Sequence, residues 1–552
     1  MINISKNILT ISCDRKLTTW EQMIIKNNGA KFDRNSNISI NLNATSREAM
    51  TMYLERFAPQ IKFAETEHNK LQRQKLYDYL RQYFIAVDNA INKSLMHLPF
   101  HSNMLVAQSE GAGWIMPRNF SIIGMQQGLG KTLTSLAGDV MYRSSNPAHS
   151  SGLTVYVSKA IGKYNLLEEL AGWGISESKM VVLESKQYSP YVLQGKAYAF
   201  INYDILHKLY PLLLSANITS FAFDECHKFK NVKTQTFNGV WGLVEHHKRR
   251  QLKKIVLMSG TPIANWSDDM YAYVKVNGAD MGVSVKKFRD RYLQRETNIF
   301  TGFSQVRGTQ NDEELRDMFI NVLYRRTHEN ANPDFKGINY NFRPLETAGV
   351  YDQVQKIWNS VTSYTSIAEA ESRILAINRI TSIAKAPETI KFAKELLAKG
   401  KKVVIFSFFI DTLKTIEEEL SKTHETYKLV GSMTSKQKFE ASYNFQNNNK
   451  PCVFIGQTLS AGESANLQSA HETIFNDLPL TWKDLEQAIF RTVRIGQKEI
   501  AQMYFMLCAG TCDEDIADII IRKHGSSANI IDRGKMQFKS FDFSGVDLDI
   551  DI

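Results

Sequence analysis

The chain has 552 residues, 43% of them hydrophobic, which is enough for two large domains with separate cores and a smaller third one. Its net charge of +10 favours a polyanionic partner such as nucleic acid, although basic proteins without such a partner are common. The five scattered cysteines argue against a disulfide framework, and the longest apolar run, residues 403–410, is too short to span a bilayer. With no start resembling a signal peptide, the sequence predicts a soluble cytoplasmic protein.

Residues 1–94 predict a small α/β accessory domain. Two strand-like pieces, at residues 7–12 and 37–42, precede a helical stretch from Ser46 to Phe57. Thr45 or Ser46 is suited to cap this helix, and Glu48 follows closely behind.

A glycine-rich loop follows the apolar run Phe120–Ile123, which is typical of a buried strand. Residues 125–132 nearly match the phosphate-binding pattern G-x-x-x-x-G-K-[ST], but Met125 stands where its first glycine belongs. Apolar residues recur at helical spacing directly after the loop. In such an arrangement backbone N–H groups surround phosphate oxygens, Lys131 reaches the outer phosphates and the Thr132 hydroxyl binds magnesium. The alternative is an ordinary glycine-rich turn with an incidental lysine.

Two adjacent acids end a later strand. In Phe221-Ala-Phe-Asp-Glu-Cys-His-Lys228 the apolar run stops at Asp224 and Glu225, and open α/β sheets place their chemistry at strand ends. Asp224 is suited to hold the hydrated magnesium that Thr132 also contacts, and Glu225 to orient and deprotonate an attacking water. A solvated loop start is the alternative reading of the same pair.

A third strand-like run, Ile255–Met258, leads into the small polar turn of Ser259, Gly260 and Thr261. Such a turn could sense whether a terminal phosphate is present, or it could be a plain proline turn after a strand.

Gln487, Arg491 and Arg494 fall on one face of a predicted helix far along the chain. No acid stands three or four residues from either arginine, and like charges so placed repel mildly unless an anion joins them. Guanidinium groups that reach a triphosphate explain the arrangement better than a solvated basic face does.

Taken in order, these motifs resemble the helicase-like ATPases of superfamily two, in their Swi/Snf-related branch. The resemblance covers about residues 95–525. It is carried in the first part by GLGKT at 128–132, DECH at 224–227, SGTPIAN at 259–265 and LYRRT at 323–327. It is carried in the second part by VVIFS at 403–407, Gly431 with Phe445, SAGESANL at 460–467 and QAIFRTVRIGQ at 487–497. The segment 288–315 and ITSIAKA at 380–386 look most like the annealing-helicase, fork-remodelling relatives.

The resemblance implies an α/β fold with two RecA-like lobes, each a parallel sheet flanked by helices. Lobe 1 is expected over residues 95–344, a helical linker over 345–385, lobe 2 over 386–525 and a tail with an acidic end over 526–552. ATP and Mg²⁺ are the implied cofactors.

The same resemblance assigns residues to roles. Nucleotide binding falls to Gln127, Gly128, Leu129, Gly130, Lys131, Thr132 and Gly462, with Thr132 and Asp224 on the metal. Catalysis falls to Lys131, Asp224, Glu225, Gln487, Arg491 and Arg494, and coupling to Ser259, Gly260 and Thr261. The DNA contacts of the family fall at Lys159, Lys163, Tyr203 and Ser407.

Three departures from the family pattern bear on function. Met125, Gln126 and Gln127 replace the usual Asp-Glu-Met, but these relatives commonly lack the first glycine, so the loop is still predicted to bind phosphate. The adenine-reading glutamine of the family corresponds to His101, which puts adenine selectivity in question. Lys438 replaces an arginine and would hold phosphate without a bidentate fork.

The implied function is that of an ATP-dependent double-stranded DNA translocase that remodels or anneals branched DNA. Strand exchange is nearly neutral in energy, whereas separating a duplex costs about 1.4 kcal/mol per stacked step. A strand-unwinding DNA or RNA helicase and an inactive architectural DNA-binding protein remain as alternatives.

The two ends of the chain keep open interpretations. Residues 1–94 either help to recognise branched DNA or brace lobe 1. The alternating apolar and acidic residues 546–552 form either a docking segment for a replication or recombination protein or a frayed end. We expect a monomer, and the Asn- and Lys-rich composition favours a phage or bacterial source.

Overall fold

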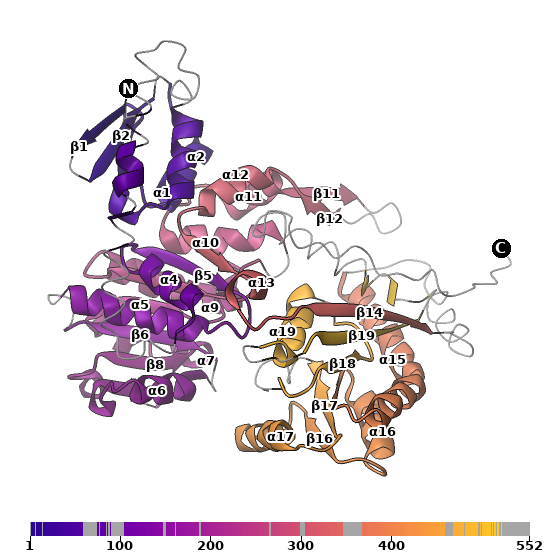
Figure 1. The fold of residues 1–552 in the computed structure, drawn as a ribbon. Helices are drawn as coiled ribbons and strands as arrows, with labels where there is room; N and C mark the ends of the chain where they lie inside the picture. The colour runs from indigo at the N-terminus through magenta and orange to yellow at the C-terminus, as the bar shows by residue number, and fades with distance from the viewer. Residues whose placement is uncertain are drawn as a thin grey trace.

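The computed structural model contains two parallel sheets, each flanked by helices, and a small antiparallel sheet near the N-terminus (Figure 1). It describes residues 2–58, 104–146, 151–297, 304–345, 367–458 and 467–508, except 6, 14, 160, 161, 187, 188, 264, 265, 480, 495, 496 and 498, together with scattered positions in 74–89 and 511–520. The fold predicted from the sequence, two sheets with helices on their faces, is confirmed. No helix in the described ranges is both long and apolar enough to cross a membrane.

The N-terminal domain pairs its strands in the order β1-β2-β4-β3. Its elements are β1 (Ile2–Ser5), β2 (Ile8–Ser12), α1 (Thr19–Asn27), β3 (Lys31–Phe32), β4 (Asn37–Asn41) and α2 (Arg47–Phe57). Alternating apolar residues on β2 and β4 are fully buried, which gives the sheet one core face. Ser46 is the cap of α2, since its side chain accepts a hydrogen bond from the Ala49 N–H.

Asparagines fasten this domain to lobe 1. The Asn27 amide donates to the carbonyl of Met318 at 2.8 Å, and Asn28 Oδ1 accepts from the Asn321 N–H at 2.8 Å. All three asparagines are at most 2% exposed. Buried, reciprocal hydrogen bonds of this kind support a bracing role for the domain.

The seven strands of lobe 1 lie parallel in the order β13-β5-β10-β9-β6-β8-β7. They are β5 (Phe120–Met125), β6 (Leu153–Ser158), β7 (Met180–Val182), β8 (Tyr198–Asn202), β9 (Ile218–Phe223), β10 (Lys254–Met258) and β13 (Leu323–Arg326). Five of these strands, β5, β6, β8, β9 and β10, are buried along their whole length, as expected for a sheet covered on both faces.

Helices flank this sheet, and a two-stranded hairpin lies apart from it, next to the helices that precede and follow the hairpin in the chain (Figure 1). The helices are α4 (Val106–Ile115), α5 (Lys131–Ser145), α6 (Gly162–Gly172), α7 (Tyr203–Leu206), α8 (Tyr210–Ser215), α9 (Gln235–Lys248), α10 (Met270–Asn277), α11 (Val285–Tyr292), α12 (Asp312–Phe319) and α13 (His328–Ala331). The hairpin pairs β11 (Leu293–Thr297) with β12 (Ser304–Thr309).

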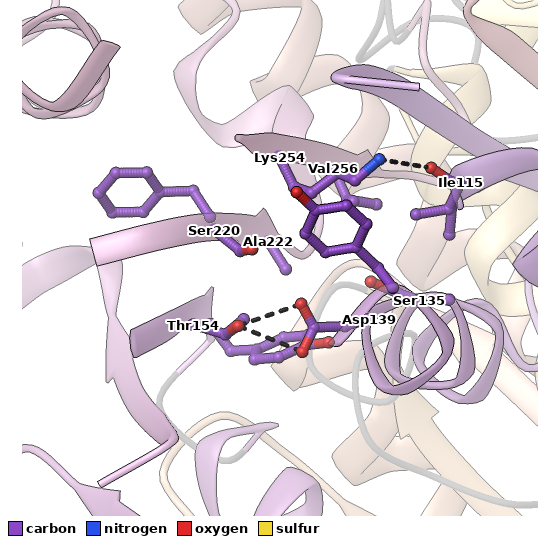
Figure 2. Close-up of a pocket in the computed structure, with 12 residues that line it drawn as sticks. Ile115, Ser135, Asp139, Thr154, Ser220, Ala222, Lys254 and Val256 are labelled. Carbon is purple, nitrogen blue, oxygen red and sulfur yellow. Dashed lines mark hydrogen bonds between the residues drawn. The ribbon is translucent and has the colours of Figure 1, made fainter. Parts of the chain in front are cut away.

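A buried polar cluster joins α5 to β6, and β10 to the end of α4 (Figure 2). On α5, Asp139 accepts a hydrogen bond from the Thr154 hydroxyl of β6 at 3.1 Å and pairs with Arg143 at 2.9 Å. Lys254 of β10 donates to the carbonyls of Met116 and Arg118, each at 2.6 Å, just beyond the end of α4. The cavity between these groups measures about 10 Å³, room for about one water.

The six strands of lobe 2 are also parallel, in the order β14-β19-β18-β15-β17-β16. They are β14 (Ile338–Leu345), β15 (Val403–Ser407), β16 (Thr426–Leu429), β17 (Val453–Gln457), β18 (Glu472–Phe475) and β19 (Ala501–Cys508). The helices are α15 (Ile367–Ala398), α16 (Ile410–Leu420), α17 (Ser435–Asn447) and α19 (Trp482–Thr492).

Sheet pairing places the crossover between the lobes earlier than the sequence analysis did. Strand β14 pairs along its whole length with β19, so residues 338–345 lie in the sheet of lobe 2 and not in lobe 1, whose end was expected at 344. The sheet that an edge strand joins depends on the strand with which it pairs, and the partner of β14 lies far along the chain. The local sequence of β14 therefore does not show to which sheet it belongs. Helix α15 occupies the expected linker from residue 367 onward and continues to Ala398.

Candidate functional site

The glycine-rich loop connects β5 to α5 through two left-handed residues. Gly128 has φ +83° and Gly130, the residue before the helix, has φ +81°, which residues with side chains rarely adopt. Met125 is instead the last residue of β5 and is fully buried. The missing glycine of the pattern therefore falls on a strand position, where no left-handed backbone is needed.

A chain of side chains runs from this loop to the acid pair. Lys131, only 7% exposed, donates from Nζ to Gln127 Oε1 at 3.1 Å, and Gln127 Nε2 donates to Glu225 Oε1 at 3.2 Å. Burial lowers the pKa of Lys131, and the carboxylates of Glu225 and Asp224 oppose that shift. The lysine thus reaches the acids through a neutral amide.

Asp224 and Glu225 directly follow β9, and their surroundings shift the pKa values of the two carboxyl groups in opposite directions. Burial, with the adjacent Glu225 carboxylate, raises the pKa of Asp224 to about 6. Burial also disfavours ionised Glu225, but nearby positive charge, His227 first and then Lys131 and Lys159, outweighs it and lowers the pKa to about 2. Because burial lowers the pKa of His227 itself and so favours its neutral form, we regard Lys131 and Lys159 as the lasting source of that charge.

The turn after β10 touches both the acids and the loop. His227 Nδ1 lies 3.2 Å from Ser259 Oγ and 3.3 Å from Glu225 Oε2, and Ser259 Oγ accepts from the Thr261 N–H. Gly260 approaches the loop so closely that a Cβ there would lie 2.9 Å from Gln127 Nε2. Of the three residues predicted to sense phosphate, Gly260 thus lies against Gln127 of the loop. Ser259 is linked to Glu225 through His227, and Thr261 is bonded to Ser259.

Gln487 and Arg491 lie on helix α19 of lobe 2, but the helix ends at Thr492 because the backbone is extended at Val493. The sequence analysis was therefore wrong to place Arg494 on the same helix face, and Arg494 instead meets the loop of lobe 1 from two residues beyond the helix. Arg494 Cγ lies 3.2 Å from the position that a Cβ on Gly128 would take. Burial lowers the pKa of Arg494 to about 10, and Arg491 is 9% exposed and close enough to Lys131 to lower its pKa further. Gln487, 3% exposed, has no hydrogen-bond partner for Nε2 within the described part of the chain. The structure therefore brings together residues that are far apart in sequence.

Some predicted site residues lie elsewhere. Lys163 is 4% exposed and forms an ion pair with Glu184 at 2.6 Å, and Ser407 is fully buried and donates to Asp477 at 2.6 Å. Tyr203 is 8% exposed and its hydroxyl donates to the carbonyl of Asp224 at 2.7 Å. These three side chains are occupied inside the protein, so we do not carry them into a DNA interface.

Lys159 is partly exposed at the end of β6 and keeps the DNA contact predicted for it as a prediction. Its positive charge contributes to lowering the pKa of Glu225. His101 and Gly462 lie outside the described residues.

Gln108 is a residue of this site that sequence reasoning missed. It is 4% exposed on α4, and its side chain donates from Nε2 to the carbonyl of Leu129 at 2.9 Å and accepts from the Leu105 N–H at 2.9 Å. A Cβ on Gly130 would lie 2.4 Å from the same Nε2. The sequence did offer a signal for it. Gln108 is nearer to the glycine-rich loop in sequence than His101 is, and it lies on the helix that directly precedes β5.

Family models match most of both lobes. Residues 107–383 match the SNF2-related domain and residues 388–496 the helicase conserved C-terminal domain. The chain belongs to the SNF2-related family. The family predicted from the motifs is thereby confirmed, and the match begins one residue before Gln108 and after His101.

Relatives of this SNF2-related chain include proteins of DNA metabolism. It is 23% identical over 434 residues to the SWI/SNF-related matrix-associated actin-dependent regulator of chromatin subfamily A-like protein 1 of Xenopus laevis, covering 76% of this chain and 43% of that protein. It is 23% identical to the DNA repair and recombination protein RAD54-like of Drosophila mojavensis, covering 77% and 62%. It is 21% identical to the DNA annealing helicase and endonuclease ZRANB3 of Bos taurus, covering 78% and 41%. The chain thus spans about half the length of these relatives.

A solved structure, the Sulfolobus solfataricus SWI2/SNF2 ATPase core in complex with dsDNA, is 22% identical, with a TM-score of 0.38 and coverage of 77% of this chain and 93% of that one.

The donors at the SNF2-related site fit a nucleotide with Mg²⁺. Thr132 in the first turn of α5 and Asp224 at the end of β9 offer hard oxygen donors. Within the described ranges no group of three or more His, Cys, Asp or Glu residues is placed to hold a metal by itself. Proteins hold Mg²⁺ through one or two oxygen groups together with substrate phosphates, and Thr132 and Asp224 are two such groups. The buried Thr261 hydroxyl, without a partner among the described residues, is a further group that a phosphate would satisfy.

Proposed function

We propose that this SNF2-related protein is an ATP-dependent double-stranded DNA translocase that remodels or anneals branched DNA. The observation that carries the proposal is the approach of Arg494 in lobe 2 to Gly128 in the loop of lobe 1, beside the buried Lys131 and the Asp224–Glu225 pair. A site divided between two lobes works only when both are in place, which links hydrolysis to their movement.

Each residue of this site has a role in the proposed hydrolysis. The loop N–H groups and Lys131 bind the phosphates, and the Glu225 carboxylate, kept ionised by the positive charges of Lys131 and Lys159, orients the attacking water and accepts its proton. Arg491 and Arg494 stabilise the negative charge that develops on the transferring phosphoryl group. Thr132 and Asp224 would hold Mg²⁺, which, when bound, neutralises charge on the phosphate oxygens.

The coupling residues give the site a path by which the phosphate state reaches the rest of lobe 1. His227 contacts both Glu225 and Ser259, so a change at the acid pair alters the turn after β10. Arg325 of β13 donates to the carbonyls of Gly124 and Gly260, each at 2.9 Å, and so ties that turn to the strand that carries the loop.

Gln108 takes over the adenine contact that the sequence analysis placed at His101. Its amide lies against the loop at Leu129 and Gly130, and an amide can pair with the adenine edge through one donor and one acceptor. Selectivity for ATP over GTP would follow. Hydrolysis of both nucleotides by Gln108→Ala, compared with the wild type, tests this assignment.

DNA is the proposed partner for three reasons. The chain carries a net charge of +10, its relatives include a DNA annealing helicase and DNA repair and recombination proteins, and exchange of strands is nearly neutral in energy. A motor of this size can therefore remodel a branch without a separate strand-splitting domain. A protein partner at the tail, residues 526–552, stays a prediction outside the described residues.

The test is steady-state ATP hydrolysis without nucleic acid and with single-stranded DNA, duplex DNA, a model fork and RNA. Lys131→Ala, which removes the buried ammonium of the loop, is the control for contaminating activity. Stronger stimulation by fork or duplex than by single strands supports the proposal. Stimulation by RNA alone, or no hydrolysis on any substrate, contradicts it.

A further inference from the structure

His328 is a buried residue that neither the motifs nor the proposed hydrolysis uses. It is the first residue of α13, directly after the LYRRT motif, and is 1% exposed. Its backbone N–H donates to Gln126 Oε1 at 2.8 Å, and its Nε2 lies 2.8 Å from the carbonyl oxygen of Gln127. Both contacts are made with the glycine-rich loop.

The hydrogen bonds define the tautomer of this histidine. A carbonyl oxygen only accepts, so Nε2 carries the proton and donates to Gln127. Nδ1 then accepts from Asn332 Nδ2 at 3.2 Å, and the orientation of Asn332 is set by the Asp334 N–H, which donates to its Oδ1 at 3.1 Å. Burial, with the positive charges of Lys131 and Arg494 nearby, lowers the pKa of His328 to about 4, so the ring stays neutral.

The face of the same ring packs on lobe 2. His328 stacks on Phe490 with ring centroids 4.9 Å apart and planes 7° from parallel. Phe490 lies on α19 between Gln487 and Arg491, is 4% exposed and departs from helical geometry, with ψ 15°. Its carbonyl accepts from Arg494 Nε at 3.4 Å. One imidazole therefore contacts the backbone of the phosphate loop and the turn from which the arginine extends.

We propose that His328 is a positioning residue whose stack on Phe490, joined to its hydrogen bond with the Gln127 carbonyl, sets Arg494 against the phosphate loop when the two lobes close. The inference rests on the proposed ATP hydrolysis. It adds the contact that aligns the phosphate loop of lobe 1 with Arg494 of lobe 2. A neutral ring suits this place, since it adds no positive charge beside Lys131 and Arg494. Gly128 leaves the required room, because a Cβ there would lie 3.7 Å from His328 Nε2 and 3.2 Å from Arg494 Cγ.

The test is a double-mutant cycle on the full-length protein with His328→Ala, Phe490→Leu and the pair combined. We expect each single variant to lower kcat for fork-stimulated ATP hydrolysis by about 10- to 100-fold, as displacement of a catalytic group by about 1 Å does. Affinity for a fluorescent ATP analogue should stay within about 2-fold, because each variant keeps the loop and Lys131. The double variant should be no slower than the worse single one, because both remove the same contact.

Further variants separate positioning from folding. His328→Phe keeps a ring on Phe490 but loses the hydrogen bond to Gln127, and it should recover part of the kcat lost in His328→Ala. Phe342→Leu is the control, because it removes an aromatic stack within lobe 2, where the ring centroids of Phe342 and Phe505 lie 5.5 Å apart. It should retain wild-type kcat. Losses that multiply in the double variant, or wild-type kcat in His328→Ala, overturn the proposal.

Small-angle scattering keeps this test separate from that of the proposed function. A non-hydrolysable ATP analogue should make the wild type more compact and should fail to do so in His328→Ala at saturating analogue. If the wild type hydrolyses no ATP with any nucleic acid, the proposed function fails while the scattering still decides the role of His328. Equal compaction of both proteins overturns the role of His328 whatever the hydrolysis shows.

Discussion

Replacing Gly130 with alanine tests how the phosphate loop is held. Its φ of +81° is left-handed, which costs an alanine about 1 kcal/mol. The new Cβ would also lie 2.4 Å from Gln108 Nε2, so that buried side chain must move and give up its bonds with Leu129 and Leu105. At about 1 kcal/mol for each hydrogen bond, the free energy of unfolding should fall by about 3 kcal/mol in total.

Gly174→Ala is the matched control, because Gly174 has φ +82° and nothing lies within 4 Å of a Cβ built there. For a domain of this size each kcal/mol lowers Tm by about 2–4 °C, so Gly130→Ala should lose about 6–12 °C and Gly174→Ala about 2–4 °C in thermal unfolding. The Gln108→Ala substitution should lower Tm less in the Gly130→Ala background than in the wild type, because it removes the amide that collides with the new Cβ. Equal losses of Tm in the two alanine variants would refute the reasoning.

Three further predictions concern the chemistry of the site. Glu225→Gln should retain ATP binding and lose turnover by at least about 10²-fold, since a general base contributes that much, and near-normal single-turnover hydrolysis would exclude Glu225 as the base. Arg494→Ala should bind ATP nearly as well as the wild type and hydrolyse it about 10³-fold or more slowly, and normal hydrolysis would show that the two-lobe site is wrong. The raised pKa of Asp224 predicts that kcat/KM rises with pH through about 6 and then levels, because the ionised carboxylate is the form that binds Mg²⁺. Because the pKa of Asp224 is higher in the folded protein than in the unfolded chain, the ionised Asp224 carboxylate destabilises the folded state above about pH 6. Asp224→Asn should therefore raise Tm at pH 8 without added Mg²⁺. A lower Tm would contradict the raised pKa.

Local sequence predicted the elements whose cause is local. The run Phe120–Ile123 forms part of a buried strand because both faces of a covered parallel sheet require apolar residues. Ser46 caps α2 because its hydroxyl accepts from the otherwise unbonded N–H of the third helix residue, Ala49. Strand β14 could not be placed in this way, since its eight residues are half-exposed or exposed and take their sheet from β19. The role of Gln108 could not be predicted locally either, because it depends on contact with the glycine-rich loop, from which Gln108 is separated in sequence by strand β5.

By itself the sequence predicted the family and, through that resemblance, the two parallel sheets, and it supplied the chemical groups of the proposed site, because glycine, lysine, paired acids and arginines are what phosphate chemistry requires. Only the tertiary structure decided which of those groups meet. It directed Lys163, Tyr203 and Ser407 into internal contacts, brought Gln108 to the loop, and set His328 between the loop and Phe490. The physical reason is that a spacing fixes residues on one strand or helix, whereas contacts between elements depend on how whole faces pack, and packing is settled by the complete core.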